Sequence, residues 1–261
     1  MNLIQTNQLI KFFIITGYLS IVIVVPLIST AFNAIVLIIT LHSILFISGI
    51  FWYWIGGFLI LKKNQFTFLE GEKCQELQNS ILEWKKKIGL KTNIKIGILD
   101  EALPNAFTLF LNPRKYAIIL SVGIFENLDN SEIKAVIAHE LFHIKNRDVW
   151  VKALFIIGRF ISFPMGPFIE SYISRSREVQ ADLESSKFTK DPLSLASALM
   201  KMVKCYYTNP HLEFNINSVS KSFWIINNTN KKHRNIIRRL LSRHPSIENR
   251  VKKLMLYKIK D

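Results

Sequence analysis

Cysteine and acidic residues are scarce in this chain of 261 residues. Cys74 and Cys205 stand far apart and in no metal-binding spacing, which argues against a disulfide framework and agrees with a reducing compartment. Asp and Glu number 19 against 34 Lys and Arg, so the formal net charge is +15. We expect no nucleic acid partner, because the chain has no nucleic-acid-binding motif. An anionic lipid surface explains more simply the basic clusters at residues 85–87, 231–239 and 252–260.

Charged side chains are absent from fifty consecutive residues between Lys11 and Lys62. A single soluble core helix of this length is implausible, whereas two membrane spans of about 20 residues fit. We place the spans at about residues 12–28 and 34–61, with a turn at residues 29–33. The sequence therefore predicts a multi-pass membrane protein that has the lipid bilayer as a partner.

The cations around this apolar stretch predict its orientation. Lys11, Lys62 and Lys63 lie outside the two spans and the turn between them has no cation. By the positive-inside rule both ends face the cytoplasm. We therefore expect residues 1–63 to be an anchor in the cell (plasma) membrane and residues 64–261 to be a cytoplasmic catalytic domain. About 200 residues are enough for one domain with a full core.

The segment His139-Glu140-Leu141-Phe142-His143 contains two histidines four residues apart. On a helix these positions share a face, so both imidazoles can bind one zinc ion. Glu140 is then placed to accept a proton from a water molecule that the metal activates. An Asp-x-x-Glu capping pattern at Asp129 and Glu132, followed by apolar residues at helical spacing, predicts that the motif lies on a helix.

A catalytic zinc site needs a third protein ligand, and Glu178 is the best candidate in the sequence. Asp182 lies one helical turn beyond Glu178. A carboxylate at that place can accept the second N–H of a ligand histidine and fix the orientation of its ring. We predict one Zn²⁺ per chain, bound by His139, His143 and Glu178.

Four further segments resemble motifs of one protease family. His143 is followed by a H-x-x-x-x-D extension that ends at Asp148, and residues 174–182 resemble an S-R-x-R-E-x-x-A-D box. Residues 104–107 read P-N-A-F, and residues 244–250 fit H-P-x-x-x-x-R. The chain thus resembles HtpX-type membrane zinc metalloproteases, gluzincins whose family also contains the type 1 CAAX prenyl endopeptidases.

The resemblance implies roles for these segments. Asp148 would be a local structural anchor. Asn105, Ala106 and Phe107 would form an edge strand along the bound peptide. His244 would face the oxyanion of the transition state, and Arg250 would help to order the site.

Two departures from the family pattern concern substrate and topology. Thr108 stands where the family has a small residue, which affects substrate preference. The stretch between the histidine helix and Glu178, which contains the apolar residues 149–169, is short for this family. Thirty-four residues separate His143 from Glu178, too few for two spans of about 20 residues, although both ligands must meet on one side of the membrane. We therefore expect residues 149–169 to dip into the membrane surface or to pack in the domain.

The remaining pattern predicts an α+β fold that is mainly α: an N-terminal transmembrane helical hairpin followed by a zincin-type metalloprotease domain with a small sheet. We expect helices at residues 70–90 and 192–206, with Asp191 as the N-cap of the second. Strands are expected at residues 94–99, 105–111 and 116–120, of which the second is an edge strand.

The hypothesis is a membrane-anchored zinc endopeptidase that acts on polypeptides. The resemblance suggests quality control of membrane or misfolded proteins. A non-catalytic zinc-binding adaptor and a CAAX-type prenyl-protein endopeptidase are alternatives. A site-2-type intramembrane protease is disfavoured, because Lys145, Asn146, Arg147 and Asp148 follow the motif at once. The oligomeric state stays open.

Overall fold

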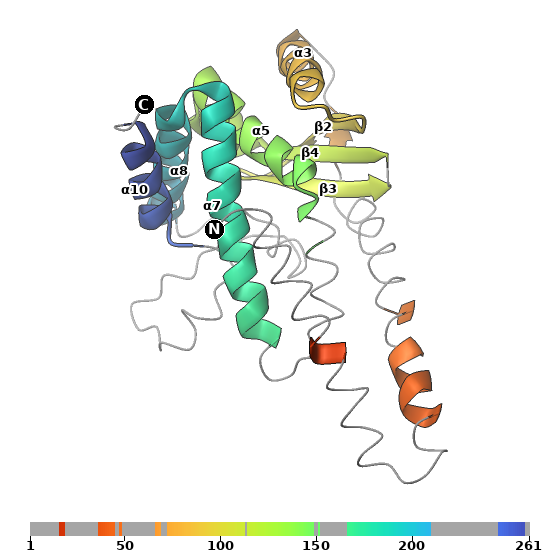
Figure 1. Cartoon of the computed structure of the whole chain (residues 1–261). Helices are drawn as coiled ribbons and strands as arrows, with labels where there is room; N and C mark the ends of the chain where they lie inside the picture. The colour runs from red at the N-terminus through yellow and green to blue at the C-terminus, as the bar shows by residue number, and fades with distance from the viewer. Residues whose placement is uncertain are drawn as a thin grey trace.

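The computed structural model describes residues 16–18, 36–44, 47–48, 66–68, 72–112, 114–148, 151, 166–209 and 245–258. Within these ranges the fold is mainly helical with one small mixed sheet, as the sequence predicts (Figure 1). Its elements are β1 (Phe66–Phe68), α3 (Glu72–Lys87), β2 (Asn93–Leu99), β3 (Ala106–Asn112), β4 (Lys115–Ser121), α4 (Val122–Asn127), α5 (Asn130–Lys145), α7 (Gly166–Thr189), α8 (Pro192–Thr208) and α10 (Ile247–Lys258).

The sheet has four strands in the order β1-β2-β4-β3. β2 and β4 are parallel, whereas β1 pairs with β2 and β3 pairs with β4 in antiparallel fashion. β3 therefore lies at an edge, as predicted. The sequence did not reveal β1, since three residues are too few for a strand periodicity to be seen.

Helix α5 lies between the sheet and a layer formed by α7, α8 and α10 (Figure 1). Its start is fixed by the predicted capping box: the Asp129 side chain accepts from the Glu132 backbone N–H at 2.9 Å, and the Glu132 carboxylate accepts from the Asp129 N–H at 2.9 Å. Most of α5 is buried, because it has protein on two sides. The helix thus lies between the sheet and the other helices.

The start of α8 is fixed by its N-cap and by a proline in its first turn. Asp191 caps α8 by accepting from the Ser194 N–H at 3.1 Å, and Pro192 occupies the first turn, as predicted. The end of the apolar stretch at residues 149–169 forms the first turn of α7, and most of the remainder lies outside the described residues. α10 packs on α8 and α7, and its Val251 and Leu254 are buried.

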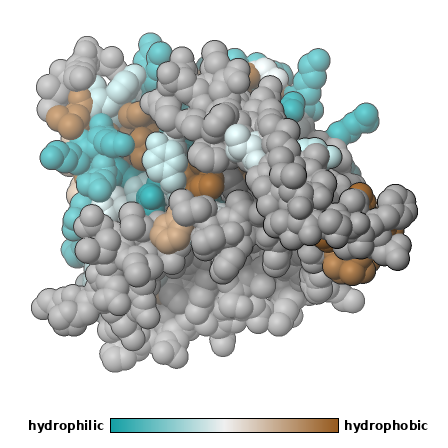
Figure 2. Space-filling model, turned by 60° about the horizontal axis from the view of Figure 1, so that its bottom comes forward, coloured by the Kyte–Doolittle hydropathy of each residue, from teal (hydrophilic) through white to brown (hydrophobic). Residues whose placement is uncertain are grey.

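Apolar side chains are exposed on the described part of the N-terminal region. Residues 36–44 are helical, and Leu37, Ile39 and Ile44 are 60%, 60% and 57% exposed. Figure 2 shows hydrophobic side chains gathered at its right edge, on the side where Figure 1 draws this helix. Most of the two predicted spans lies outside the described ranges. Among the helices that are described, none has both the length and the apolar character needed to cross a bilayer.

Candidate metal centre

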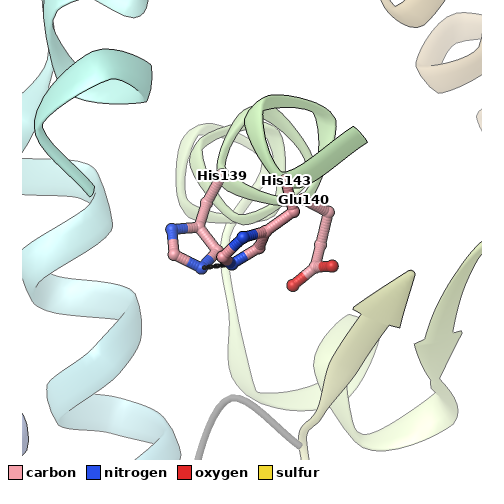
Figure 3. Close-up of side chains that lie close together, drawn as sticks. All are labelled: His139, Glu140 and His143. Carbon is pink, nitrogen blue, oxygen red and sulfur yellow. Dashed lines mark hydrogen bonds between the residues drawn. The ribbon is translucent and has the colours of Figure 1, made fainter. Parts of the chain in front are cut away.

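Helix α5 presents His139, Glu140 and His143 within one turn, facing α7 and the edge of the sheet (Figure 3). The Nε2 atoms of the two histidines are 3.0 Å apart. One ligand atom from each of the three residues lies within 4.8 Å of the others, and all three residues are buried. Two imidazole nitrogens that point at one spot with a carboxylate beside them form a metal-binding group.

Glu178, on α7, lies close to both histidines. Its Oε2 lies 3.7 Å from Nε2 of His139, and its Oε1 lies 3.6 Å from Nε2 of His143. Ligand bonds of about 2.0–2.2 Å in a tetrahedral zinc site put neighbouring donor atoms about 3.3 Å apart. The separation of 3.0 Å between the two nitrogens is close to this value, and each nitrogen has a different oxygen of Glu178 at 3.6 or 3.7 Å, so the three residues surround one point.

The ring of His139 is oriented from α7 and α10. Oδ1 of Asp182 lies 3.0 Å from Nδ1 of His139. Arg250 holds the other side of this carboxylate, because its Nε donates to Oδ2 and its Nη2 donates to Oδ1, both at 2.7 Å. Arg250 is 1% exposed, and its Nη1 lies 3.5 Å from Oε2 of Glu178. One guanidinium therefore contacts the carboxylates of both Glu178 and Asp182.

The pKa values of this group reflect the same contacts. Burial alone would lower the pKa of His139, but hydrogen bonding to Asp182 and Glu178 outweighs it and raises the pKa to about 9. Burial would raise the pKa of Asp182, but Arg250 and His139 hold it below its usual range. Without a metal, His139 is therefore protonated at neutral pH, and a metal ion must displace that proton.

The ring of His143 is oriented by the segment just after α5. Arg147 has a φ of 56°, so the chain turns back at the end of the helix. This turn brings Oδ2 of Asp148 to 2.5 Å from Nδ1 of His143. Arg177 of α7 donates to Oδ1 of Asp148 and, at 3.2 Å, to the carbonyl of Asn146. Each histidine thus has its own carboxylate, and each carboxylate has its own arginine.

The carboxylate of Glu140 points towards the sheet (Figure 3). There Oγ1 of Thr108, on β3, lies 2.7 Å from Oε2 of Glu140. Sequence reasoning treated Thr108 only as a departure that affects substrate preference. It also missed Arg177, although this residue stands in the motif that contains Glu178. Neither contact leaves a local signal, since each joins elements about thirty residues apart.

The predicted substrate strand begins at the edge of the sheet. Asn105, Ala106 and Phe107 are 2%, 0% and 2% exposed. Ser121 donates its N–H to the carbonyl of Asn105 at 2.9 Å. Backbone groups alternate along an antiparallel pair, so Ala106 and Thr108 direct theirs away from β4, to the outer edge of β3. His244 lies outside the described residues, directly before the last described range, which starts at Pro245.

The H-E-x-x-H helix, with its buried pair of histidines and a glutamate of α7 beside them, is typical of a metallopeptidase. Comparison with known families agrees. The profile of "BlaR1 peptidase M56" matches residues 20–186, and that of "Peptidase family M48" matches residues 160–257.

Two similar proteins have the name "Protease HtpX homolog". That of Salinibacter ruber is 31% identical over 229 residues, covering 77% of this chain and 81% of that protein. That of Polynucleobacter necessarius is 26% identical over 237 residues, covering 78% and 81%. The chain belongs to the HtpX family of M48 zinc metallopeptidases. The crystal structure of S. mikatae Ste24p shares the fold, with a TM-score of 0.53 and 20% identity over 96% of this chain and 67% of that one.

Proposed function

We propose that this metallopeptidase is a membrane-anchored zinc endopeptidase. The observation that carries the proposal is the convergence of His139, His143 and Glu178, with donor atoms 3.0–3.7 Å apart, next to the carboxylate of Glu140. One zinc ion per chain would be held by these three residues. When bound, it supplies a Lewis acid that polarises the scissile carbonyl and lowers the pKa of a water molecule to about 7.

Glu140 is the general base of the proposed reaction. Its carboxylate accepts the proton of the attacking water and then passes that proton to the leaving amine. This role needs an ionised carboxylate within reach of the metal-binding group, and Glu140 meets the geometric part of that requirement because it lies beside both histidines.

The remaining polar side chains hold these groups in place. Asp182 and Asp148 each fix one imidazole through its Nδ1, so that Nε2 is left for the metal. Arg250 and Arg177 neutralise the two carboxylates and lock their orientation. We place Arg250 among these positioning residues, because its guanidinium is engaged by Asp182. For His244 we keep the role of oxyanion donor. One such donor stabilises the transition state by about 3 kcal/mol.

Polypeptides would bind as an added strand on the outer edge of β3. Within the described part of the chain β3 has a single neighbour in the sheet, β4. An extended peptide would pair with the outward backbone groups of Ala106 and Thr108, next to Asn105 and Phe107, and would have to uncover them, since Ala106 is 0% and Thr108 6% exposed. Because such pairing uses backbone atoms, it favours unfolded segments over a particular sequence. This supports quality control of membrane or misfolded proteins as the task.

The proposed location is the cell membrane, with residues 1–63 as the anchor and the catalytic domain in the cytoplasm. Fifty uncharged residues between Lys11 and Lys62 support the anchor, and the exposed apolar side chains of residues 36–44 suit a lipid environment. Lys11, Lys62 and Lys63 support the orientation.

The test is cleavage of casein, an unfolded model protein, by the detergent-purified and zinc-loaded full chain. The Glu140→Gln variant serves as the matched control, since it keeps the size of the side chain and removes the base. We expect cleavage by the wild type, its loss in the variant and equal zinc content in both. Bound zinc without cleavage in either protein would favour the non-catalytic adaptor.

A further inference from the structure

The edge strand β3 touches the proposed general base through one side chain. Oγ1 of Thr108 lies 2.7 Å from Oε2 of Glu140 and 3.3 Å from the Glu140 carbonyl oxygen. Both residues are buried, with exposures of 6% and 3%. We propose that Thr108 is a positioning residue that holds the carboxylate of Glu140 for proton transfer. This inference rests on the proposed function and adds a residue to its machinery.

The chemistry of the contact decides where the single hydroxyl proton goes. A threonine hydroxyl has one proton to donate, and two oxygens of Glu140 compete for it. The carboxylate oxygen is closer by 0.6 Å, and a bond to an ionised acceptor is stronger than a bond to a neutral carbonyl. Thr108 therefore donates to Oε2. Oε1 is then the oxygen left to accept the proton of the attacking water.

Glu140 needs such a partner because of its length. A glutamate side chain has three rotatable bonds, and a general base works only within hydrogen-bond reach of its proton donor. Asp182 and Asp148 orient the two histidines. Thr108 does the same for the third functional group of α5. A buried hydroxyl that comes from a strand is a rigid donor, because Thr108 is paired with Ile118 in the sheet.

Thr108 is also placed to contact both the general base and the bound peptide. Its side chain faces Glu140, while its backbone groups point to the outer edge where the peptide would pair. A peptide bound there would rest on the same residue that positions the base. A contact to substrate backbone alone would affect binding, whereas positioning of Glu140 affects the chemical step. Steady-state kinetics separate these two roles.

The experiment compares Thr108→Val, Thr108→Ser and Thr92→Val in the full-length, zinc-loaded protein. Valine keeps the shape of threonine without the hydroxyl, and serine keeps the hydroxyl. Thr92 serves as the control, because it is a loop residue whose buried hydroxyl has no hydrogen-bond partner among the described residues. We expect Thr108→Val to lower kcat on an unfolded casein peptide about ten-fold, with KM nearly unchanged. Thr108→Ser should restore most of kcat, and Thr92→Val should match the wild type.

Zinc content and unfolding free energy separate a positioning role from a loss of metal or of folding. Zinc per chain should be equal in all variants, because Thr108 does not contact the ligands. In denaturant unfolding, Thr108→Val and Glu140→Ala should be non-additive, since either change alone breaks the same bond. A wild-type kcat in Thr108→Val, a change confined to KM, or a Thr108→Ser variant as slow as Thr108→Val would overturn the inference. If the wild type is no faster than Glu140→Gln, the proposed function itself fails.

Discussion

Arg250 donates two hydrogen bonds of 2.7 Å to Asp182, and so ties the last described helix to the carboxylate that orients His139. The two residues are 68 positions apart in the chain, and both are buried. The pair joins α10 to α7 at the metal centre. The C-terminal part of the chain is therefore part of the metal site, although it holds none of the three proposed ligands.

Replacement of Arg250 should damage stability and metal binding together. Arg250→Ala leaves two buried carboxylates without their cation, which costs about 3–5 kcal/mol of unfolding free energy. Arg250→Lys keeps the charge but loses the two-pronged bond, so we expect zinc binding weakened about 10–100-fold. Denaturant unfolding and a competitive zinc chelator measure the two effects. The exposed Lys252 on the same helix gives the control Lys252→Ala, and equal effects of both would refute the assignment.

The second arginine should act through His143. Arg177→Gln removes the cation that holds Asp148, so the ring of His143 loses its fixed orientation. We expect zinc affinity to fall about ten-fold or more while the fold is kept. Lys187→Gln, on the exposed side of α7, is the matched control for charge loss. A chelator competition that gives the same zinc affinity for Arg177→Gln and the wild type would show that Asp148 needs no support.

Zinc binding should release a proton near neutral pH. The pKa of His139 is raised to about 9, so at pH 7.5 the apoprotein has this group protonated, and the metal needs it neutral. We expect release of about one proton in calorimetric titrations with zinc in buffers of different ionisation enthalpy. Asp182→Asn removes the first of the contacts that raise this pKa, so it should reduce the release. A binding heat that does not depend on the buffer would contradict the raised pKa.

The raised pKa of His139 also makes the stability of the apoprotein depend on pH. The pKa of His139 is higher in the folded state than its ordinary value of 6.5, so the charged form stabilises the fold. This contribution is complete below about pH 6.5 and is lost as the pH rises through about 9. Denaturant unfolding of the metal-free protein should therefore show falling stability between these values. His139→Gln should flatten this part of the curve, and an unchanged slope in that variant would assign the effect to another group.

Local sequence patterns predicted much of the fold correctly. The capping box at Asp129 and Glu132 and the Asp191-Pro192 start of α8 are short-range features, and the structure has both where predicted. The edge position of β3 was also predicted correctly. Strand β1 was missed because its three residues gain their pairing from β2 and not from a pattern of their own.

The candidate site, too, was predictable from local sequence patterns only in part. The spacing of His139 and His143 gives their shared face from helix geometry alone. The contacts of Thr108 with Glu140 and of Arg177 with Asp148 depend on how β3, α5 and α7 pack, and no spacing rule encodes that packing. Arg250 was placed near the site only by resemblance, and the bidentate bond to Asp182 gives the physical reason for its position.

We propose that one zinc ion is held by His139, His143 and Glu178, with Glu140 as base and not as ligand. The most direct measurement is zinc per chain and casein cleavage, determined side by side for Glu178→Gln and Glu140→Gln in the full-length protein. We expect that Glu140→Gln keeps about one zinc and loses cleavage, whereas Glu178→Gln loses both. Full zinc content and cleavage in Glu178→Gln, or cleavage that survives in Glu140→Gln, would contradict it.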